Sequence, residues 1–182
     1  MSIVITGNPG VGKHTIAQQI ADRMKFTIID INKIAKDSGL FEKNDDTNDI
    51  DVEKLEKILG QKISENNVIV GHLAPYVLRK SQVKTMIVLR RSPYDLIPVY
   101  KDRKYSDKKI MDNTGSEILG IIANDAITKF QEKTFQVNVS GRTVAETLEK
   151  VMSVIVNKEG SEEVDWLGLV TKNNDLGKFF AD

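Results

Sequence analysis

A glycine-rich stretch near the start of the chain, residues 5–15 (ITGNPGVGKHT), has the residue types and spacing of a phosphate-binding loop. Such loops follow the pattern Gly, any four residues, Gly, Lys and then Ser or Thr. Gly7, Gly12 and Lys13 fit this pattern, and His14 stands at the hydroxyl position. Glycines allow backbone N–H groups to curl around phosphate oxygens, while the lysine supplies positive charge to the β- and γ-phosphates. The stretch therefore predicts binding of a nucleoside triphosphate.

His14 bears on the metal that accompanies such a nucleotide. In the usual loop the hydroxyl is a ligand of Mg²⁺, a hard cation that prefers oxygen, and imidazole is a poor substitute. Thr15 comes next, but its side chain points about 100° away around the helix. We expect the nucleotide to bind with weakened or rearranged Mg²⁺ coordination, with Thr15 as the remaining candidate metal ligand. Alternatively, His14 is a partly exposed residue that simply fits, because the backbone supplies most of the phosphate binding. The loop residues expected to contact ATP are Gly10, Val11, Gly12, Lys13, His14 and Thr15.

The elements around the loop have the order that this chemistry requires. Ile3, Val4 and Ile5 form a short β-branched run, and apolar residues recur at helical spacing over residues 13–24. Further strands are expected at residues 26–30, 68–72, 85–90 and 135–139, and further helices at 51–63, 94–103, 106–133 and 143–156. Strands separated by helices predict an α/β fold, a five-stranded parallel sheet with helices on both faces.

Composition excludes several classes of protein. The 26 Lys and Arg residues balance 26 Asp and Glu residues, so the net charge does not indicate a nucleic-acid or membrane partner. The 182 residues contain no cysteine, which excludes disulfides and thiolate metal sites. No run approaches the roughly 18 apolar residues of a membrane helix. We expect one cytoplasmic domain over residues 1–182, with no membrane association and a monomeric state.

Two polar segments interrupt the alternation of strands and helices. Residues 42–49 are acidic and predict a solvated loop or flap, and residues 100–109 are mostly charged. In a phosphate-loop protein they could be mobile covers over two substrates, although charged runs are usually just surface. This arrangement favours a nucleoside monophosphate kinase with a monophosphate-binding region at about 30–51 and a lid at about 100–110. The tail, residues 157–182, either docks on the body or waits for a partner. A GTPase is excluded because no Asn-Lys-x-Asp follows a late strand.

Several segments together resemble a known family. They are GNPGVGKHT at residue 7, VIVGHLAPY at 68, VLRRSP at 88, DRKYSDKKIMDN at 102 and DW at 165. They are similar to the archaeal adenylate-kinase-like proteins, which are related to the eukaryotic nuclear adenylate kinase and ATPase of small ribosomal subunit maturation. The resemblance implies a P-loop NTPase fold of the monophosphate kinase type and reversible phosphoryl transfer from ATP to AMP with Mg²⁺. It also implies ATP hydrolysis, binding of the ribosomal protein uS11, and a role near pre-ribosomal 16S rRNA.

The resemblance also assigns residues. Gly10, Gly12, Lys13 and Thr15 match the family's nucleotide loop, and Arg103 matches a lid arginine that contacts ATP. Because phosphoryl transfer depends on positioning and on neutralising charge, we expect Lys13 and Arg103 to be the catalytic residues. A solvated lid residue is the alternative for Arg103.

Four further polar residues and one short polar segment carry open alternatives. His72 could orient an attacking water or be a structural histidine. Asp30, Asn32 and Asp51 flank the expected monophosphate site, and SGRT at 140–143 follows the last strand, where adenine usually rests. Asp30 is the only acid that ends an expected strand in the N-terminal half, so it could serve the metal or the second substrate. All are helix-cap residue types at helix starts, so the structural interpretation is preferred. Two other functions also remain open: a nucleotide-switched ribosome assembly ATPase, and a kinase for a non-nucleotide substrate.

Overall fold

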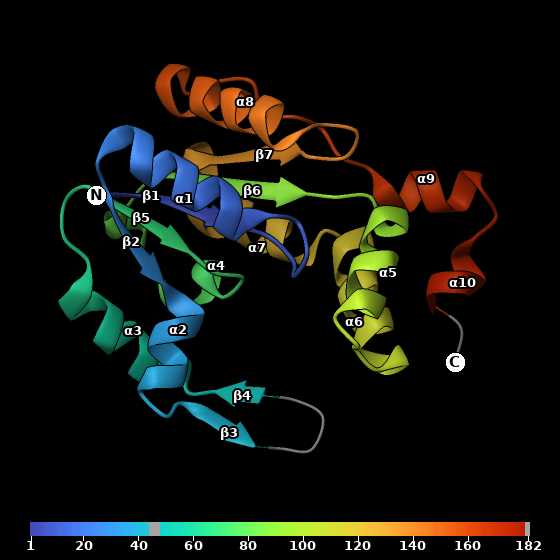
Figure 1. The fold of residues 1–182 in the computed structure, drawn as a ribbon, viewed down its shortest axis with the longest axis horizontal. Coiled ribbons are helices and arrows are strands. Elements are labelled where there is room, and N and C mark those ends of the chain that lie inside the picture. Colours follow the sequence, from blue (N-terminus) through green and yellow to red (C-terminus); the bar gives the residue numbers. More distant parts are fainter. Residues whose placement is uncertain (44–47, 181–182) are drawn as a thin grey trace.

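The centre of the molecule is a parallel sheet. A computed structural model describes residues 1–43 and 48–180, with side chains described outside 41–49. In the described chain the main sheet has five strands in the order β2-β5-β1-β6-β7 (Figure 1), and all neighbouring pairs are parallel. The strands are β1 Ser2–Thr6, β2 Thr27–Asp30, β5 Asn67–Val70, β6 Val83–Arg90 and β7 Thr134–Asn138. The sheet predicted from the sequence is confirmed.

Strand β1 lies in the middle of this sheet and is buried along its whole length. Its residue Ile5 is paired with Val70 of β5 on one side and with Ile87 of β6 on the other. Because parallel strands end at the same edge of a sheet, the glycine-rich loop that follows β1 lies beside the ends of β5 and β6. This edge is where the predicted site residues come together.

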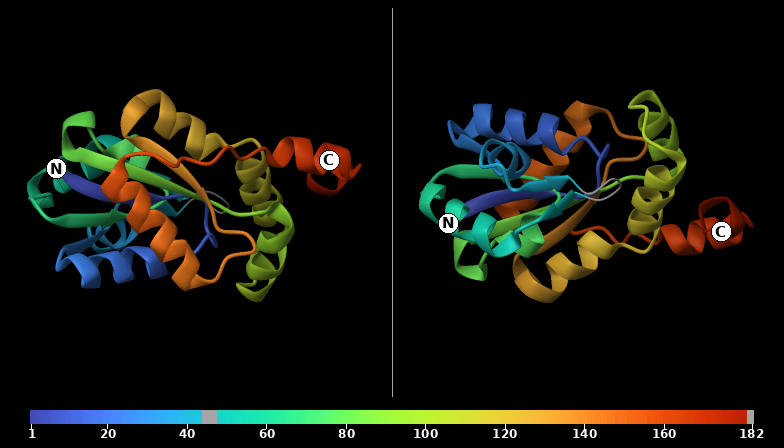
Figure 2. Two further views of the ribbon diagram at one scale, coloured as in Figure 1. Left: turned by 90° about the horizontal axis from the view of Figure 1, so that it is seen from above. Right: turned by 90° about the horizontal axis from the view of Figure 1, so that it is seen from below.

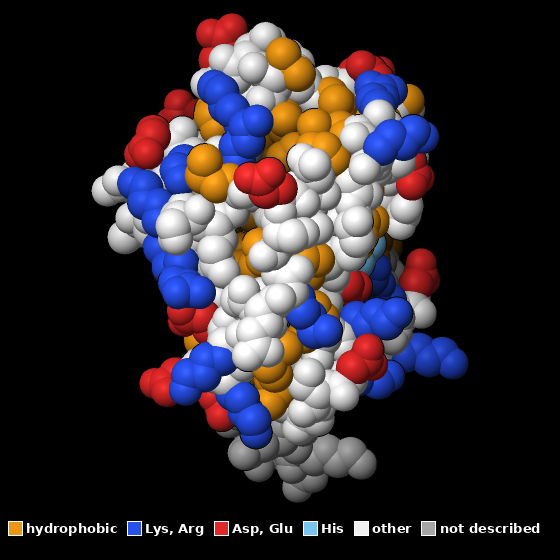
Figure 3. Space-filling view, turned by 90° about the vertical axis from the view of Figure 1, so that its left-hand side faces the viewer, with side chains coloured by type: hydrophobic (Ala, Val, Ile, Leu, Met, Phe, Trp, Pro, Cys, Tyr) orange, Lys and Arg blue, Asp and Glu red, His pale blue; other side chains and the backbone are white. Residues whose placement is uncertain are grey.

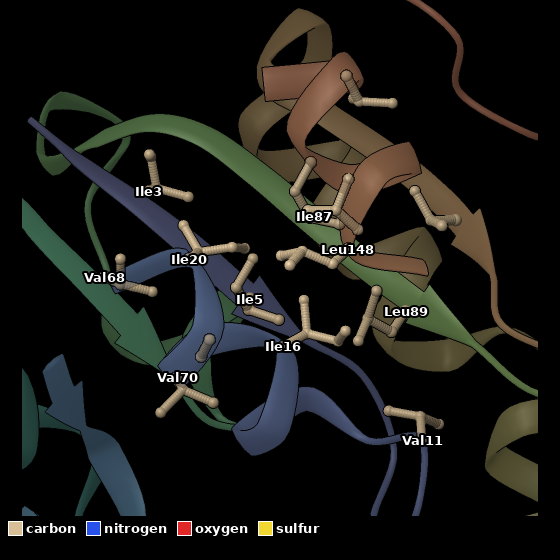
Figure 4. Packing of buried hydrophobic residues seen from close by; sticks show 14 of the residues in the cluster. Ile3, Ile5, Val11, Ile16, Ile20, Val68, Val70, Ile87, Leu89 and Leu148 are labelled. Carbon is tan, nitrogen blue, oxygen red and sulfur yellow. The ribbon is translucent and has the colours of Figure 1, made fainter. Parts of the chain in front are cut away.

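Helices cover both faces of the sheet, as expected. Helices α1 (Lys13–Met24) and α8 (Val144–Asn157) cover one face (Figure 1). Ile16 and Ile20 of α1 pack on Ile5 and Ile87, and Leu148 of α8 joins the same cluster (Figure 4). The opposite face is covered by α2 (Ile31–Asp37), α3 (Val52–Lys62), α4 (Ala74–Val77) and α7 (Ile121–Phe130). The helical spacing over residues 13–24 therefore predicted both the extent of α1 and its buried side.

The single long helix expected over residues 106–133 is wrong. Two helices are present, α6 (Asp107–Ile118) and α7, followed by a 3₁₀ turn over Gln131–Lys133. Gly120 separates them with a left-handed φ of 65°, a conformation that glycine adopts without strain. The break lets α7 bury Ala126 and Phe130 against the sheet, whereas α6 turns away beside α5 (Pro93–Asp102).

The region around residues 30–51 contains more secondary structure than the sequence suggested. It begins with α2, and β3 (Phe41–Lys43) pairs antiparallel with β4 (Asn48–Ile50). The two ends of the predicted loop or flap over residues 42–49 therefore belong to strands that pair with each other. Hydrogen bonds between backbone groups can form such a pair in a polar segment that lacks an alternating apolar pattern. The middle of this segment, residues 44–47, lies outside the described residues.

The charged segment 100–109 spans a tight turn between two helices. Helix α5 ends at Asp102, and α6 begins at Asp107 with Ser106 as its N-cap. Lys104 has a φ of 56° within the turn. Tyr105 stacks on Tyr100 of α5, with ring centroids 5.5 Å apart. The segment predicted as a lid is thus short, and its base is packed.

The C-terminal segment docks on the body, which the sequence left undecided. Its helices α9 (Trp166–Lys172) and α10 (Leu176–Phe180) lie at the far end of the molecule beside α5 and α6 (Figure 2). Trp166 and Phe179 are buried there in a small cluster with Ile118 of α6. The hydroxyl of Tyr94 in α5 donates a hydrogen bond to Asp175 at 2.7 Å. These contacts connect the tail to the two helices that carry the turn at 103–106.

The surface agrees with the balanced composition. On the face shown in Figure 3, Lys and Arg side chains are interspersed with Asp and Glu. Among the helices of the described chain, none is both long and apolar enough to cross a membrane.

Candidate active site

The loop between β1 and α1 requires glycine for two separate physical reasons. A Cβ on Gly7, which has a φ of 134°, would lie 2.4 Å from the carbonyl oxygen of Leu89. Gly12 precedes α1 with a left-handed φ of 88° and no side-chain cap. The first N–H groups of α1 and the positive end of its dipole are therefore available to an anion.

This loop lines a cavity of 880 Å³ at the edge of the sheet. Of the residues predicted to bind nucleotide, the cavity brings together Gly10, Gly12, Lys13, His14, Thr15 and Arg103. Val11 does not line this cavity; its side chain is buried and belongs to the core cluster, and it borders the smaller cavity described below. Figure 4 shows it on the loop. Among the described lining side chains, Lys13, Arg103, Lys108 and Lys109 are cationic, against one carboxylate, that of Asp112. The cavity is therefore suited to an anionic ligand.

Lys13 is held at the base of this cavity. Its side chain is only 5% exposed, and its Nζ donates a hydrogen bond to the carbonyl oxygen of Asn8 at 3.1 Å. The pKa of Lys13 is lowered to about 8, chiefly by burial and also by the positive charge of Arg103, while the negative charge of Asp30 acts in the opposite direction. A phosphate would relieve the unfavourable burial of this ammonium, so the burial of Lys13 favours an anion beside it.

A buried carboxylate on α6 positions the loop. Glu117 is 1% exposed, and its Oε2 accepts a hydrogen bond from Asn8 in the loop at 2.7 Å. Its Oε1 accepts from Arg90 Nε at 2.8 Å, from the backbone N–H of Arg91 at 3.1 Å, and from Trp166 Nε1 at 3.0 Å. One carboxylate therefore connects the phosphate loop, the end of β6 and the C-terminal segment.

Two further side chains brace the loop backbone. The hydroxyl of Tyr100 donates to the carbonyl of Pro9 at 2.7 Å, and Arg91 donates to the carbonyl of Gly10 at 3.0 Å. Sequence reasoning missed both residues, as it missed Glu117. In the sequence, two consecutive arginines stand at the end of β6, and a single acid lies among apolar residues of α6. Neither feature shows which group the side chain will bond in the fold.

His14 meets Asp30 at the rim of the cavity. Its Nε2 lies 3.1 Å from Asp30 Oδ2, and the His14 side chain is half exposed. The other carboxylate oxygen, Oδ1, accepts from the backbone N–H of Lys33 and caps α2. Asp30 therefore has the predicted helix-cap role and also contacts the residue that replaces the loop hydroxyl.

His72 follows β5 and lines the cavity. The strand expected over residues 68–72 ends at Val70, and Gly71 then passes close to α2, where a Cβ would lie 2.8 Å from Ile31 Cβ. Burial, together with the nearby charges of Lys13, His14 and Lys109, lowers the pKa of His72 to about 4. The ring is thus neutral at pH 7 and can exchange hydrogen bonds with water or substrate.

The other cap-type residues divide into two groups. Asp51 accepts from Lys54 N at the start of α3, and Thr143 accepts from Glu146 N at the start of α8, so both are helix caps as predicted. The expectation for Asn32 is wrong, because it lies inside α2, where Asp30 already provides the cap. Asn32 lines the cavity instead, and its Oδ1 is buried without a hydrogen-bond partner in the described structure. A buried acceptor of this kind is satisfied by a ligand N–H or O–H group.

A second cavity of 250 Å³ lies on the other side of the loop. Gly12 and Thr15 border both cavities, and the smaller one is closed by residues 139–142 after β7. Arg91 and Arg142 line it together with Asp95. This is the segment where the sequence suggested that adenine rests.

Comparison with known proteins agrees with this arrangement. A family model described as an AAA domain matches residues 3–120, which include β1, the loop, α5 and all of α6. The chain belongs to this family. A protein of Methanocaldococcus jannaschii named "Putative adenylate kinase" is 31% identical over 172 residues, covering 91% of this chain and 93% of that protein. One of the same name from Methanosarcina barkeri is 30% identical and covers 93% of this chain and 100% of its own. The expected relationship to archaeal proteins of this kind is confirmed.

Solved structures share the fold at lower identity. A shikimate kinase from Bacteroides thetaiotaomicron has a TM-score of 0.58 at 16% identity, over 86% of this chain and 98% of that chain. Deoxyadenosine kinase from M. mycoides has a TM-score of 0.57 at 17% identity, over 86% of this chain and 100% of that chain. The predicted P-loop fold of the monophosphate kinase type is therefore confirmed.

Proposed function

We propose that the protein is a nucleoside monophosphate kinase that transfers the γ-phosphoryl group of ATP to AMP, reversibly. The observation that carries the proposal is the buried ammonium of Lys13 at the base of the 880 Å³ cavity, directly at the N-terminus of α1. A pocket of this size is within the range of about 300–1,000 Å³ that small-molecule sites occupy. The relatives named for adenylate kinase activity support the same reaction class.

The two substrates would approach the loop from different sides. The 250 Å³ cavity beside residues 139–142 is suited to the adenine of ATP, with the phosphates passing over Gly12 into the larger cavity. AMP would enter the larger cavity near Asn32, whose unpartnered oxygen would accept an N–H or O–H of the nucleoside. We therefore expect residues 30–51 to bind the monophosphate and the turn at 100–110 to cover the reacting phosphates.

The transfer needs cations and backbone donors rather than a protein nucleophile. An oxygen of the AMP phosphate forms a bond to the γ-phosphorus as the bond from that phosphorus to the bridging oxygen of ATP breaks, leaving two molecules of ADP. Lys13 and the N–H groups of residues 10–13 would hold the β- and γ-oxygens, and Arg103 would neutralise the charge that develops on the moving group. His72, neutral at pH 7, would orient water during slow ATP hydrolysis.

The residues present fit ATP better than they fit Mg²⁺. The loop supplies backbone N–H groups and a lysine to the phosphates, as the nucleotide requires. At the position of the metal-binding hydroxyl, however, His14 supplies a nitrogen. The exposed residue Thr15 carries the remaining hydroxyl of the loop at this point. Strand β5 ends at Val70 and is followed by Gly71, so it brings no carboxylate to the site.

An ADP-formation assay tests the proposal. ATP would be supplied with a divalent cation, with and without AMP, to the wild-type protein and to Lys13→Ala. We expect ADP formation that depends on AMP and that the substitution abolishes. A rate that AMP does not change would overturn the kinase assignment.

A nucleotide-switched role in ribosome assembly is the second candidate. The observation that favours it is Glu117, which joins the loop residue Asn8 to Trp166 of the C-terminal segment, so nucleotide binding and the docking of that segment share one carboxylate. The partners implied by the family resemblance are uS11 and pre-ribosomal RNA. ATP hydrolysis that AMP does not stimulate, but that purified uS11 changes, would favour this candidate. Unchanged hydrolysis and no co-purification of uS11 would count against it.

A further inference from the structure

Two metal-ligating atoms meet at the rim of the phosphate loop. Nε2 of His14 and Oδ2 of Asp30 are 3.1 Å apart, and His14 lines the large cavity. Helix α1 carries His14 at its second residue, directly after Lys13, which is the sequence position of the hydroxyl residue in the usual loop. Asp30 approaches from the end of β2, two strands away in the sheet.

The separation of these atoms matches a pair of neighbouring ligands on one cation. Two ligands about 2.0–2.2 Å from a metal ion lie about 2.9–3.0 Å apart at a right angle and about 3.4 Å apart at the tetrahedral angle. The observed 3.1 Å lies between these values. A cation could therefore bind both atoms with little movement of either side chain.

The carboxylate is already oriented for this role. Its Oδ1 accepts from Lys33 N at 3.1 Å, which fixes the rotation of the group and leaves Oδ2 facing His14. Supporting hydrogen bonds of this kind orient metal ligands in proteins. A neutral imidazole carries one proton, which would reside on Nδ1 while Nε2 binds the metal, so no proton is gained or lost.

We propose that His14 and Asp30 hold the divalent cation that accompanies ATP, and that this pair selects Mn²⁺, Co²⁺ or Zn²⁺ over Mg²⁺. The inference rests on the proposed function, because phosphate oxygens and water must complete the coordination. Within the described residues there is no cluster of three or more His, Cys, Asp or Glu side chains that could hold a metal alone. Imidazole suits Mn²⁺, Co²⁺ and Zn²⁺, whereas Mg²⁺ prefers oxygen ligands.

A spectroscopic experiment tests the ligand directly. The full chain would be labelled uniformly with ¹⁵N and mixed with Mn²⁺ and the unlabelled β,γ-methylene analogue of ATP. Pulsed electron paramagnetic resonance would then measure the hyperfine coupling between Mn²⁺ and ¹⁵N. We expect an imidazole coupling in the wild type and its loss in His14→Thr, which restores the usual hydroxyl.

The chain contains two histidines, so the matched control is His72→Gln, which should retain the coupling. The preference for Mn²⁺ over Mg²⁺, measured by competition for the same complex, should fall in His14→Thr by roughly tenfold or more. Even residues that only support a metal ligand change affinity by about 10- to 100-fold. Asp30→Asn retains a good helix-cap residue, and it should weaken Mn²⁺ binding while leaving the nitrogen coupling visible.

The outcomes separate this inference from the kinase assignment. Absence of a nitrogen coupling in the wild type, or a coupling that survives His14→Thr, would overturn the metal assignment. If AMP-dependent ADP formation with Mg²⁺ were nevertheless fast and required Lys13, the kinase assignment would stand alone. Binding of the analogue that does not change in Lys13→Ala would instead overturn the proposed nucleotide site itself.

Discussion

The buried carboxylate of Glu117 offers the sharpest quantitative test of how the loop is held. Replacing it by glutamine keeps the size of the side chain but removes the charge that faces Arg90, whose side chain is 4% exposed. The amide has a single oxygen, whereas the carboxylate accepts three hydrogen bonds at Oε1 and one at Oε2. In either orientation of the amide, its N–H₂ group would then face donors: the side-chain N–H of Asn8 in one case, and the N–H groups of Arg90, Arg91 and Trp166 in the other.

The expected loss of stability follows from these contacts. Removing one partner of a buried ion pair costs about 3–5 kcal/mol. Arg90 would retain its bonds to Gln136 and to the backbone carbonyl of Glu117, so we expect the lower end, about 3 kcal/mol. For a chain of this size, that corresponds to a fall of about 6–12 °C in the unfolding temperature.

Urea unfolding of the nucleotide-free protein would measure the effect. Glu149→Gln is the matched control, because it removes a carboxylate that pairs with Arg23 at 2.7 Å on the exposed surface. Exposed pairs of this kind are screened by water, so the control should unfold like the wild type. If Glu117→Gln were no less stable than Glu149→Gln, the assignment of Glu117 as the residue that fixes the loop would be refuted.

Three further predictions follow from the same geometry. Because the pKa of Lys13 is lowered to about 8, nucleotide affinity should fall as the pH rises through 8, and the unfolding free energy should rise between pH 8 and 10.5, where the unfolded lysine still binds a proton. Titration calorimetry would measure the affinity and urea unfolding the stability, each for the wild type and for Lys13→Met. A pH dependence shared by both proteins would contradict the assignment. Gly7→Ala should abolish nucleotide binding, because its Cβ would lie 2.4 Å from a carbonyl oxygen, whereas Gly177→Ala, with open space around it, should bind normally. Trp166→Phe keeps an aromatic ring but loses the N–H that bonds Glu117, and should lower the unfolding free energy by about 2 kcal/mol; wild-type stability in this variant would show that the tail is held by packing alone.

The sequence by itself determined the parts of the molecule that depend on local pattern. The β-branched run before the loop and the apolar spacing after it predicted β1 and α1, because strand and helix bury side chains with different periods. The spacing of Gly7, Gly12 and Lys13 predicted the loop, since only that order places glycine backbone and an ammonium around one anion. Alternation of strands and helices then predicted the parallel sheet.

Only the tertiary structure decided which distant residues meet. Asn8 and Glu117 are 109 positions apart, and no periodicity links a loop amide to an acid on α6. The pairing of His14 with Asp30 depends on the order of strands in the sheet, which brings the end of β2 to the start of α1. The break at Gly120 and the docking of Trp166 likewise reflect where apolar surface remained to be covered. These features arise from the packing of complete elements, and short stretches of sequence do not encode them.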